Sequence, residues 1–246
     1  MARLIWPIIN FLQAAVTAVW SAGWISVALV VRWISRDTRA PLAMARRIWA
    51  PLLIRGAGAR IELSGLEQVD FSRPHLFAIN HQSIIDIPVI FSVLPVNLRF
   101  VVKEELRRVP FLGWYIAAMG MVFVDRRERL RSLTRVRQMS ELITSGGSVV
   151  YFPEGQRSRD GRIRAFKTGA FLPAIEAGVP VVPVAVAGTG EVLPPGGFRV
   201  RPGTIRVSIG RPIETRDLRK EDRREFANEV RARVTALYEG LVERYR

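Results

Sequence analysis

The stretch Leu-Phe-Ala-Ile-Asn-His-Gln-Ser-Ile-Ile-Asp, residues 76–86, sets the local architecture of this 246-residue chain. Its first four residues are apolar and predict a short buried strand, and Pro88 just beyond it fits the start of a helix. Along a regular helix, side chains five positions apart are turned about 140° from each other. His81 and Asp86 can therefore meet only if His81 lies in a loop and Asp86 in the first helical turn. Ser83 and Asp86 also match a capping box, so a purely structural role for Asp86 is the alternative.

The rest of the chain alternates short apolar runs with helical patterns, which is typical of an α/β domain. The runs are rich in Val, Ile and Phe and predict strands at residues 60–63, 76–79, 100–102, 121–124, 148–152, 181–186 and 205–209. Helical patterns cover residues 111–119, 129–144, 168–177 and 217–246. We expect a mixed central sheet flanked by helices and preceded by a membrane-binding pair of helices. Residues 1–55 would be the membrane anchor, and residues 56–246 the α/β domain.

Residues 4–31 carry no charged side chain. As a helix they would extend roughly 42 Å, enough to cross a hydrocarbon core of about 30 Å. Pro7 and several polar residues interrupt the run, so a half-inserted or hairpin-paired helix fits as well as a full span. A cleaved signal peptide fits poorly because the run is too long and its basic cluster follows it. A buried core helix is the other alternative.

A second apolar segment, residues 41–54, reads as an interfacial amphipathic helix. At a period of 3.6 residues, one face would contain Leu42, Ala45, Ile48, Trp49 and Leu52. Basic residues lie between and within the two segments: Arg32, Arg36, Arg39, Arg46 and Arg47. Positive charge is retained on the cytoplasmic side of membranes, so we expect a cell inner membrane location with the α/β domain facing the cytoplasm.

The composition narrows the possible partners and chemistry. The formal net charge is +15, and only Lys103, Lys167 and Lys220 of the 37 basic residues are lysines. Such a preference for Arg fits a coding bias, so we expect an anionic membrane as partner and no nucleic acid. A non-catalytic basic binding protein is the remote alternative. The chain has no cysteine, and its two histidines lack metal-ligand spacing, so we expect no metal and no cofactor. His75 lacks a partner at a matching spacing and is expected at the surface.

Four sequence blocks resemble, in order and spacing, the lysophosphatidic acid (1-acylglycerol-3-phosphate) acyltransferases of the glycerolipid acyltransferase superfamily. The blocks are Asn80-His81 with Asp86; Lys103 through Pro110 and Gly113 to Gly120, Phe123, Asp125 and Arg126; residues 152–158 with 166–169; and residues 179–184. A histidine five residues before an aspartate is common by chance, whereas four ordered blocks are specific. The third block has Gln156 where the family usually has Thr, which bears on head-group preference.

The resemblance implies an enzyme that transfers an acyl chain from acyl-CoA or acyl carrier protein to the sn-2 hydroxyl of lysophosphatidic acid, giving phosphatidic acid. His81 would be the general base, oriented by Asp86. Residues implied at the phosphate head group are Lys103, Arg126, Glu154, Gly155 and Arg157. A guanidinium can bind phosphate oxygens two at a time, which suits Arg157. Glu154 is expected to brace its loop by pairing with an Arg. Another acceptor, such as a lyso-ornithine lipid or another lysophospholipid, is the open alternative.

Overall fold

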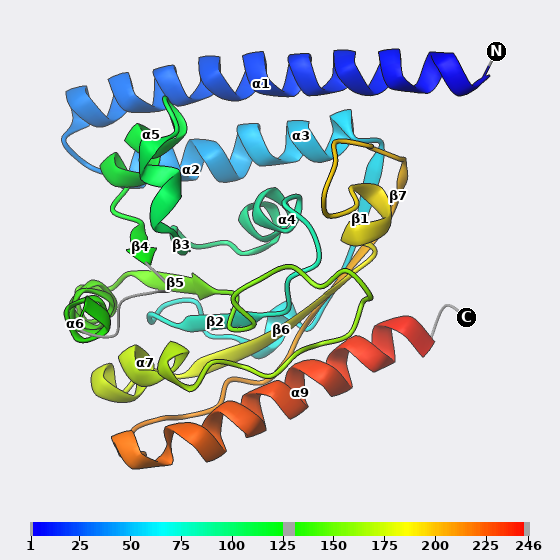
Figure 1. Cartoon of the computed structure of the whole chain (residues 1–246). Coiled ribbons are helices and arrows are strands. Elements are labelled where there is room, and N and C mark those ends of the chain that lie inside the picture. The colour runs from blue at the N-terminus through cyan, green and yellow to red at the C-terminus, as the bar shows by residue number, and fades with distance from the viewer. Residues whose placement is uncertain (1, 125–130, 244–246) are drawn as a thin grey trace.

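The residues that the structure describes, 2–124 and 131–243 of a computed structural model, form a seven-stranded sheet with helices on both faces (Figure 1). The strands are β1 (Ala59–Ser64), β2 (Leu76–Ile79), β3 (Leu98–Lys103), β4 (Val122–Val124), β5 (Ser148–Tyr151), β6 (Val181–Ala187) and β7 (Gly203–Ile209). Their order is β1-β7-β6-β2-β5-β3-β4. Neighbouring strands are parallel except for the antiparallel pair β6 and β7. The mixed α/β fold predicted from the sequence is confirmed.

The two central strands, β2 and β6, are buried at every position. A parallel strand with helices on both faces has no solvent side, which explains the uninterrupted apolar runs in the sequence. Side chains along β2 alternate between the faces. Phe77 and Ile79 join the core that contains α4 (Asp86–Val93), whereas Leu76 and Ala78 join the core that contains α9 (Arg223–Glu243). The sheet therefore separates two apolar cores.

Helices α6 (Arg131–Thr144), α7 (Leu172–Ala177) and α9 cover one face of the sheet (Figure 1). Helix α4 covers the other face, with α5 (Leu112–Ala118) beside it and the short α8 (Thr189–Val192) following β6. Short 3-10 turns complete the described chain: Leu66–Gln68, Glu104–Arg108, Thr168–Ala170 and Lys220–Asp222. The three-layer arrangement leaves the two ends of the strands as the places where loops can form sites.

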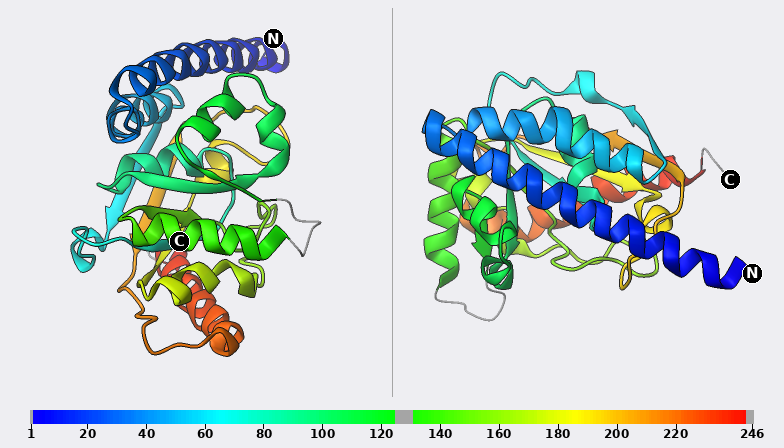
Figure 2. Two further views of the ribbon diagram at one scale, coloured as in Figure 1. Left: turned by 90° about the vertical axis from the view of Figure 1, so that its left-hand side faces the viewer. Right: turned by 90° about the horizontal axis from the view of Figure 1, so that it is seen from above.

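The N-terminal segment forms α1 (Ala2–Ser35), α2 (Arg39–Met44), a π-helical turn (Ala45–Trp49) and α3 (Ala50–Gly56). Seen from above in Figure 2, α1 crosses diagonally over α2 and α3. From residue 7 onward, Ile25 and Ala28 are the only apolar side chains of α1 that are fully buried in the core, whereas Phe11 is 72% and Val19 74% exposed. Among the described residues, one helical stretch is long and apolar enough to cross a membrane, and it is Pro7–Ser35 of α1.

The predicted apolar face of residues 41–54 is only partly correct. Leu42 and Ala45 are buried as expected, but Ile48 and Leu52 are each 42% exposed. The π-helical turn explains the difference, because its wider hydrogen-bond spacing rotates the residues that follow it. Ala50 and Ile54 are buried instead, outside the predicted face.

Two predicted helices begin later than expected. The C-terminal helix starts at Arg223 instead of residue 217, after a 3-10 turn in which the Arg219 N–H donates to the Asp222 carboxylate at 2.7 Å. The helix predicted over residues 168–177 divides into the turn Thr168–Ala170 and α7, with Pro173 in the first turn of α7. The first residue of each helix is decided by local hydrogen bonds or by the position of Pro. Hydrophobic periodicity, on which the predictions rest, contains no information about either.

The predicted surface position of His75 is wrong. The residue is fully buried just before β2, its ring lies 5.7 Å from that of Phe77 and 6.4 Å from that of Phe71, and both ring nitrogens lack a hydrogen-bond partner. Burial, followed by the nearby charge of Arg73, lowers the pKa of His75. His75 is buried because it immediately precedes β2, a strand that is buried at every position. The prediction considers only the absence of a partner residue at a matching spacing.

Candidate active site

Three neighbouring parallel strands bring most of the predicted site residues to one edge of the sheet. The strands β2, β5 and β3 are adjacent, so their carboxyl ends point the same way. His81 follows β2, Lys103 ends β3, and the loop with Glu154 and Arg157 follows β5. The carboxyl edge of the strands is where open α/β sheets bind ligands. Arg126 lies outside the described residues.

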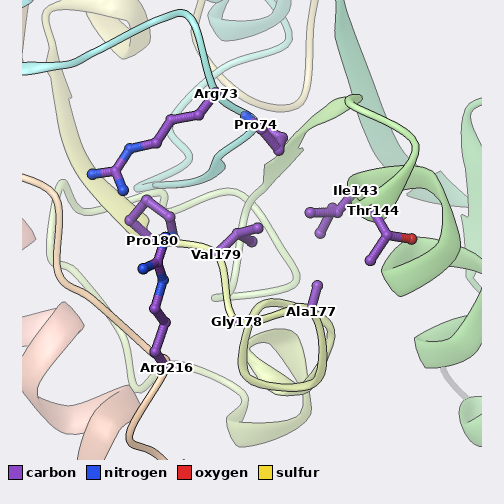
Figure 3. Close-up of a pocket in the computed structure, with 9 residues that line it drawn as sticks. All are labelled: Arg73, Pro74, Ile143, Thr144, Ala177, Gly178, Val179, Pro180 and Arg216. Carbon is purple, nitrogen blue, oxygen red and sulfur yellow. The ribbon is translucent and has the colours of Figure 1, made fainter.

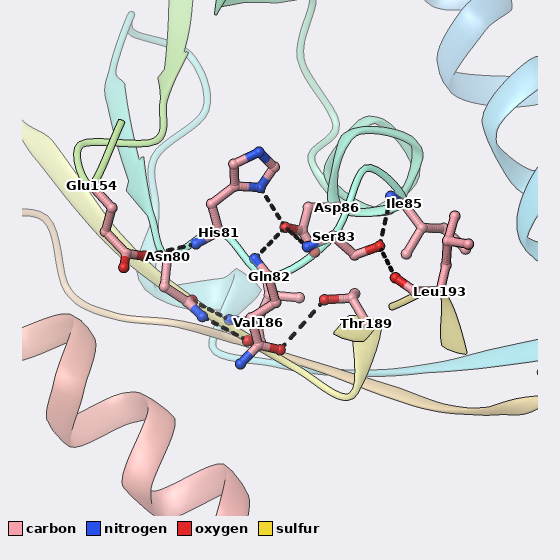
Figure 4. Close-up of polar contacts among 10 residues, drawn as sticks. All are labelled: Asn80, His81, Gln82, Ser83, Ile85, Asp86, Glu154, Val186, Thr189 and Leu193. Atoms are coloured by element: carbon pink, nitrogen blue, oxygen red, sulfur yellow. Dashed lines mark hydrogen bonds and ion pairs between the residues drawn. The ribbon is translucent and has the colours of Figure 1, made fainter. Parts of the chain in front are cut away.

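The pairing of His81 with Asp86 has the geometry that the spacing predicts. Helix α4 begins at Asp86, and His81 lies in the loop before it. The imidazole Nδ1 is 2.6 Å from Asp86 Oδ2, which also accepts the backbone N–H groups of Gln82 at 2.8 Å and Ser83 at 2.9 Å (Figure 4). The Asp86 side chain is fully buried, whereas that of His81 is 18% exposed. Asp86 therefore holds the loop backbone and the imidazole with the same oxygen.

Contacts around His81 fix its backbone and its ring. The Asn80 side chain makes two hydrogen bonds to the backbone of Val186, at 2.9 and 2.8 Å, which ties the end of β2 to the end of β6. The ring of Phe152 stacks on the imidazole with a centroid separation of 4.1 Å. Sequence analysis gave no role to either residue, although both stand in the matched blocks. The contacts leave Nε2 of His81 directed away from Asp86 (Figure 4).

Glu154 braces the loop through backbone groups and not through the guanidinium that we predicted. Its Oε1 accepts the N–H of His81 and its Oε2 accepts the N–H of Arg164, both at 2.9 Å. The N–H of Ser158 donates to the His81 carbonyl at 2.7 Å. Burial raises the pKa of Glu154. The loop after β5 and the loop after β2 are therefore joined directly.

Cationic side chains lie at the carboxyl ends of β3 and β5 and at Lys167, to which sequence analysis gave no role. Arg157 is exposed and has no ion pair among the described residues, while Lys103 is 50% exposed and lies 2.8 Å from Glu105. Gly155 has a left-handed φ of +74°, and a Cβ there would lie 2.9 Å from the ammonium of Lys167. Lys167 therefore lies over the turn. Its identity as one of three lysines was the available signal.

A cavity of about 480 Å³ lies at the opposite edge of the sheet, where β2 and β6 begin (Figure 3). Arg73, Pro74 and Pro180 contribute to its lining, together with the ends of α6 and α7. None of the predicted site residues that the structure describes lines it, so the cavity is separate from the His81 edge.

Comparisons with known proteins agree with the arrangement. The acyltransferase family model matches residues 60–187, just over half of the chain. A chloroplastic 1-acyl-sn-glycerol-3-phosphate acyltransferase of Arabidopsis thaliana is 37% identical over 68% of this chain and 47% of that protein. A 1-acyl-sn-glycerol-3-phosphate acyltransferase of Pseudomonas aeruginosa is 35% identical over 66% of this chain and 62% of that protein. The chain spans about half the length of the plant relatives that it matches.

A solved structure resembles nearly the whole chain. The crystal structure of the 1-acyl-sn-glycerophosphate (LPA) acyltransferase PlsC from Thermotoga maritima has a TM-score of 0.81 and 27% sequence identity. The match covers 96% of this chain and 98% of that one. The region matched by the family model extends from the second residue of β1 to the end of β6. It contains His81, Asp86 and the loop after β5. The chain belongs to the acyltransferase family.

Proposed function

We propose that this chain is a membrane-associated O-acyltransferase that converts lysophosphatidic acid to phosphatidic acid, with acyl-CoA or acyl carrier protein as the acyl donor. The observation that carries the proposal is the pair His81 and Asp86, 2.6 Å apart at the carboxyl edge of the sheet. The family model covers both residues, and similar proteins are named for this acceptor, 1-acyl-sn-glycerol-3-phosphate.

The mechanism follows from the protonation that Asp86 imposes. A carboxylate accepts, so Nδ1 of His81 donates and Nε2 keeps its lone pair. Nε2 would take the proton from the sn-2 hydroxyl as its oxygen attacks the thioester carbonyl. When the tetrahedral intermediate collapses, the carbon–sulfur bond breaks and the imidazolium returns the proton to the departing thiolate. Asp86 stabilises the imidazolium while it exists, and the stacked Phe152 ring holds the imidazole plane.

The phosphate of the acceptor would bind the cations around the loop after β5. Arg157 has no partner within the described residues and so can offer its guanidinium to the phosphate oxygens. Lys103 would contribute less, because it is half exposed and already lies 2.8 Å from Glu105. Lys167 lies over Gly155 and is a third candidate. Glu154 and Gly155 would shape the loop and leave the charge contacts to these three side chains.

The location of the acceptor in a bilayer fits the N-terminal helices. Helix α1 exposes large apolar side chains along its length, among them Phe11, Val19 and Trp33. An apolar helix surface of this kind is stable when buried in lipid, whereas in water it would favour aggregation. We propose that residues 1–55 hold the domain at the cytoplasmic face of the inner membrane. The bilayer acceptor and the water-soluble thioester could then both reach His81.

The test uses the full chain in detergent micelles with acyl-CoA and acyl carrier protein thioesters and a panel of acceptors. The panel contains lysophosphatidic acid, a neutral lysophospholipid and a lyso-ornithine lipid. Lysophosphatidic acid should be the preferred acceptor, and His81→Ala should lower kcat by at least about 10²-fold. The matched control is His75→Phe, which changes the other histidine. Preference for lyso-ornithine lipid would change the acceptor, and near-normal turnover by folded His81→Ala protein would overturn the mechanism.

A further inference from the structure

A second cationic site lies at the edge of the sheet away from His81, where α1 turns into α2. An open cavity of about 1080 Å³ is formed there by the end of α1, helix α2 and the π-helical turn, with the start of β3 and the end of α6 opposite them. The elements meet at the left of Figure 1. Arginines from five separate segments line it: Arg32, Arg39, Arg46, Arg73 and Arg99.

The two acidic residues that line the cavity, Asp37 and Glu141, each form an ion pair with an arginine close to them in the sequence. Asp37 lies 3.7 Å from Arg39, and Glu141 lies 3.0 Å from Arg137. Both contacts are exposed, because the arginine partners are 83% and 82% exposed. Asp37 therefore compensates two arginines of the cavity, Arg39 by contact and Arg99 through its charge. Neither acidic group forms an ion pair with Arg32 or Arg46 among the described residues.

Arg32 and Arg46 form no ion pair in the part of the chain that the structure describes. Neither has an ion pair or a side-chain hydrogen bond there, and the Nε of each is buried without a partner. Burial and the neighbouring Arg47 lower the pKa of Arg46, so its charge is held at a cost. Buried polar groups are normally satisfied, and an unsatisfied cation is a reason to look for an anion.

Arg99 connects the cavity to the short segment between α1 and α2. It rises from β3 and donates through Nη2 to Thr38 Oγ1 at 2.5 Å. Burial lowers the pKa of Arg99 as well. Thr38 immediately precedes α2. An anion in the cavity would therefore be held between the sheet and the link that joins α1 to α2.

We propose that this cavity binds the phosphate of an anionic bilayer phospholipid, held chiefly by Arg32 and Arg46. The lipid is favoured as the source because the cavity begins where the exposed apolar surface of α1 ends. Trp33 and Ile34, next to Arg32, are 79% and 70% exposed. A phospholipid with its head group in the cavity can lay its acyl chains beside this surface. The site is separate from the acyl-transfer edge and does not depend on the proposed reaction.

The experiment measures binding of short-chain phosphatidylglycerol to the full chain in nonionic detergent, by native mass spectrometry and titration. Arg46→Gln and Arg32→Gln should each weaken binding by about tenfold or more, the value of a lost charge-assisted hydrogen bond. The matched control is Arg47→Gln, which removes the same charge from an exposed neighbour outside the cavity. It should change the affinity by less than about threefold.

Three outcomes would overturn the proposal. Equal losses for Arg46→Gln and Arg47→Gln would mean that diffuse surface charge attracts the lipid. Absence of saturable binding would mean that the cavity holds no lipid. Binding of inorganic phosphate as tightly as of phosphatidylglycerol would assign the cavity to a soluble anion. Thermal unfolding checks that each variant is folded, and Arg32→Gln carries the test if Arg46→Gln is not. Both Arg46→Gln and Arg32→Gln should still turn over detergent-dispersed lysophosphatidic acid.

Discussion

The substitution Asp86→Asn separates the charge of Asp86 from its hydrogen bonds. Oδ2 of Asp86 faces three donors, His81 Nδ1 and the N–H groups of Gln82 and Ser83, whereas Oδ1 is buried without a partner. An asparagine must therefore place its carbonyl oxygen where Oδ2 lies, because its NH₂ group would meet two backbone donors there. The amide oxygen still accepts from Nδ1, so Nε2 of His81 keeps its lone pair. The change removes the negative charge and places the NH₂ group at the buried, unpartnered position of Oδ1.

The magnitude follows from the difference between a charged and a neutral hydrogen bond. A hydrogen bond to a charged group is worth about 1.5–3 kcal/mol, and a neutral one about 0.5–1.5 kcal/mol. The imidazolium would lose about 1–2 kcal/mol of stabilisation, so kcat should fall about 5- to 30-fold. A wrong tautomer would cost about 10⁴-fold, as in triads. Asp86→Ala differs, because it leaves two backbone N–H groups unsatisfied and should cost about 2–6 kcal/mol of stability.

The assay is kcat of the full chain with lysophosphatidic acid and acyl-CoA, together with thermal unfolding of each variant. Asp86→Asn should unfold at a temperature between those of wild type and Asp86→Ala, because its buried NH₂ group lacks a partner but the loop N–H groups keep theirs. Its rate should lie between those of wild type and His81→Ala. A folded Asp86→Asn enzyme as slow as His81→Ala would refute the argument that the loop backbone preserves the tautomer. A wild-type rate would show that Asp86 only caps α4.

The remaining predictions concern the anion loop and the buried histidine. Arg157→Ala should raise the KM for lysophosphatidic acid about tenfold or more and leave the KM for acyl-CoA nearly unchanged; a rise confined to the acyl-CoA KM would assign the loop to the donor. Gly155→Ala should lower the unfolding temperature, because its φ is +74°; an unchanged temperature would contradict the left-handed conformation of this turn. His75 has a pKa lowered by burial, so the unfolded chain binds more protons and stability is lost as pH falls below about 6.5. His75→Phe should reduce that loss in denaturant titrations at about pH 7.5 and about pH 5.5, and an equal loss in both proteins would count against the assignment.

The strands could be predicted from the sequence because their signal is local. A strand buried on both faces, such as β2, must be apolar at each position, and a run of that kind is visible without knowing its neighbours. The order of the strands has no such signal. That β7 lies between β1 and β6, parallel to one and antiparallel to the other, depends on pairings across long stretches of chain. Periodicity therefore predicts the pieces, and packing decides their order.

The site divides in the same way. His81 and Asp86 are five residues apart, so helical geometry alone limits where each can lie. Phe152 stacks on His81, 71 residues away along the chain (152 − 81). Asn80 contacts Val186, 106 residues away (186 − 80). Spacing along the chain carries no information about such contacts. The family blocks mark the residues without indicating what they touch.

The two edges of the sheet together suggest how the protein is oriented at a membrane. Helix α1 of 34 residues extends roughly 51 Å along one side of the domain (Figure 1). The arginine-lined cavity lies at its C-terminal end. An apolar helix lying in an interface fixes the depth of the domain but leaves it free to turn about the helix axis. A lipid phosphate held by Arg32 and Arg46 would add a second point of attachment off that axis. The domain could then no longer rotate about the α1 axis. The edge of the sheet at which His81 lies would keep one orientation toward the bilayer that supplies the acceptor.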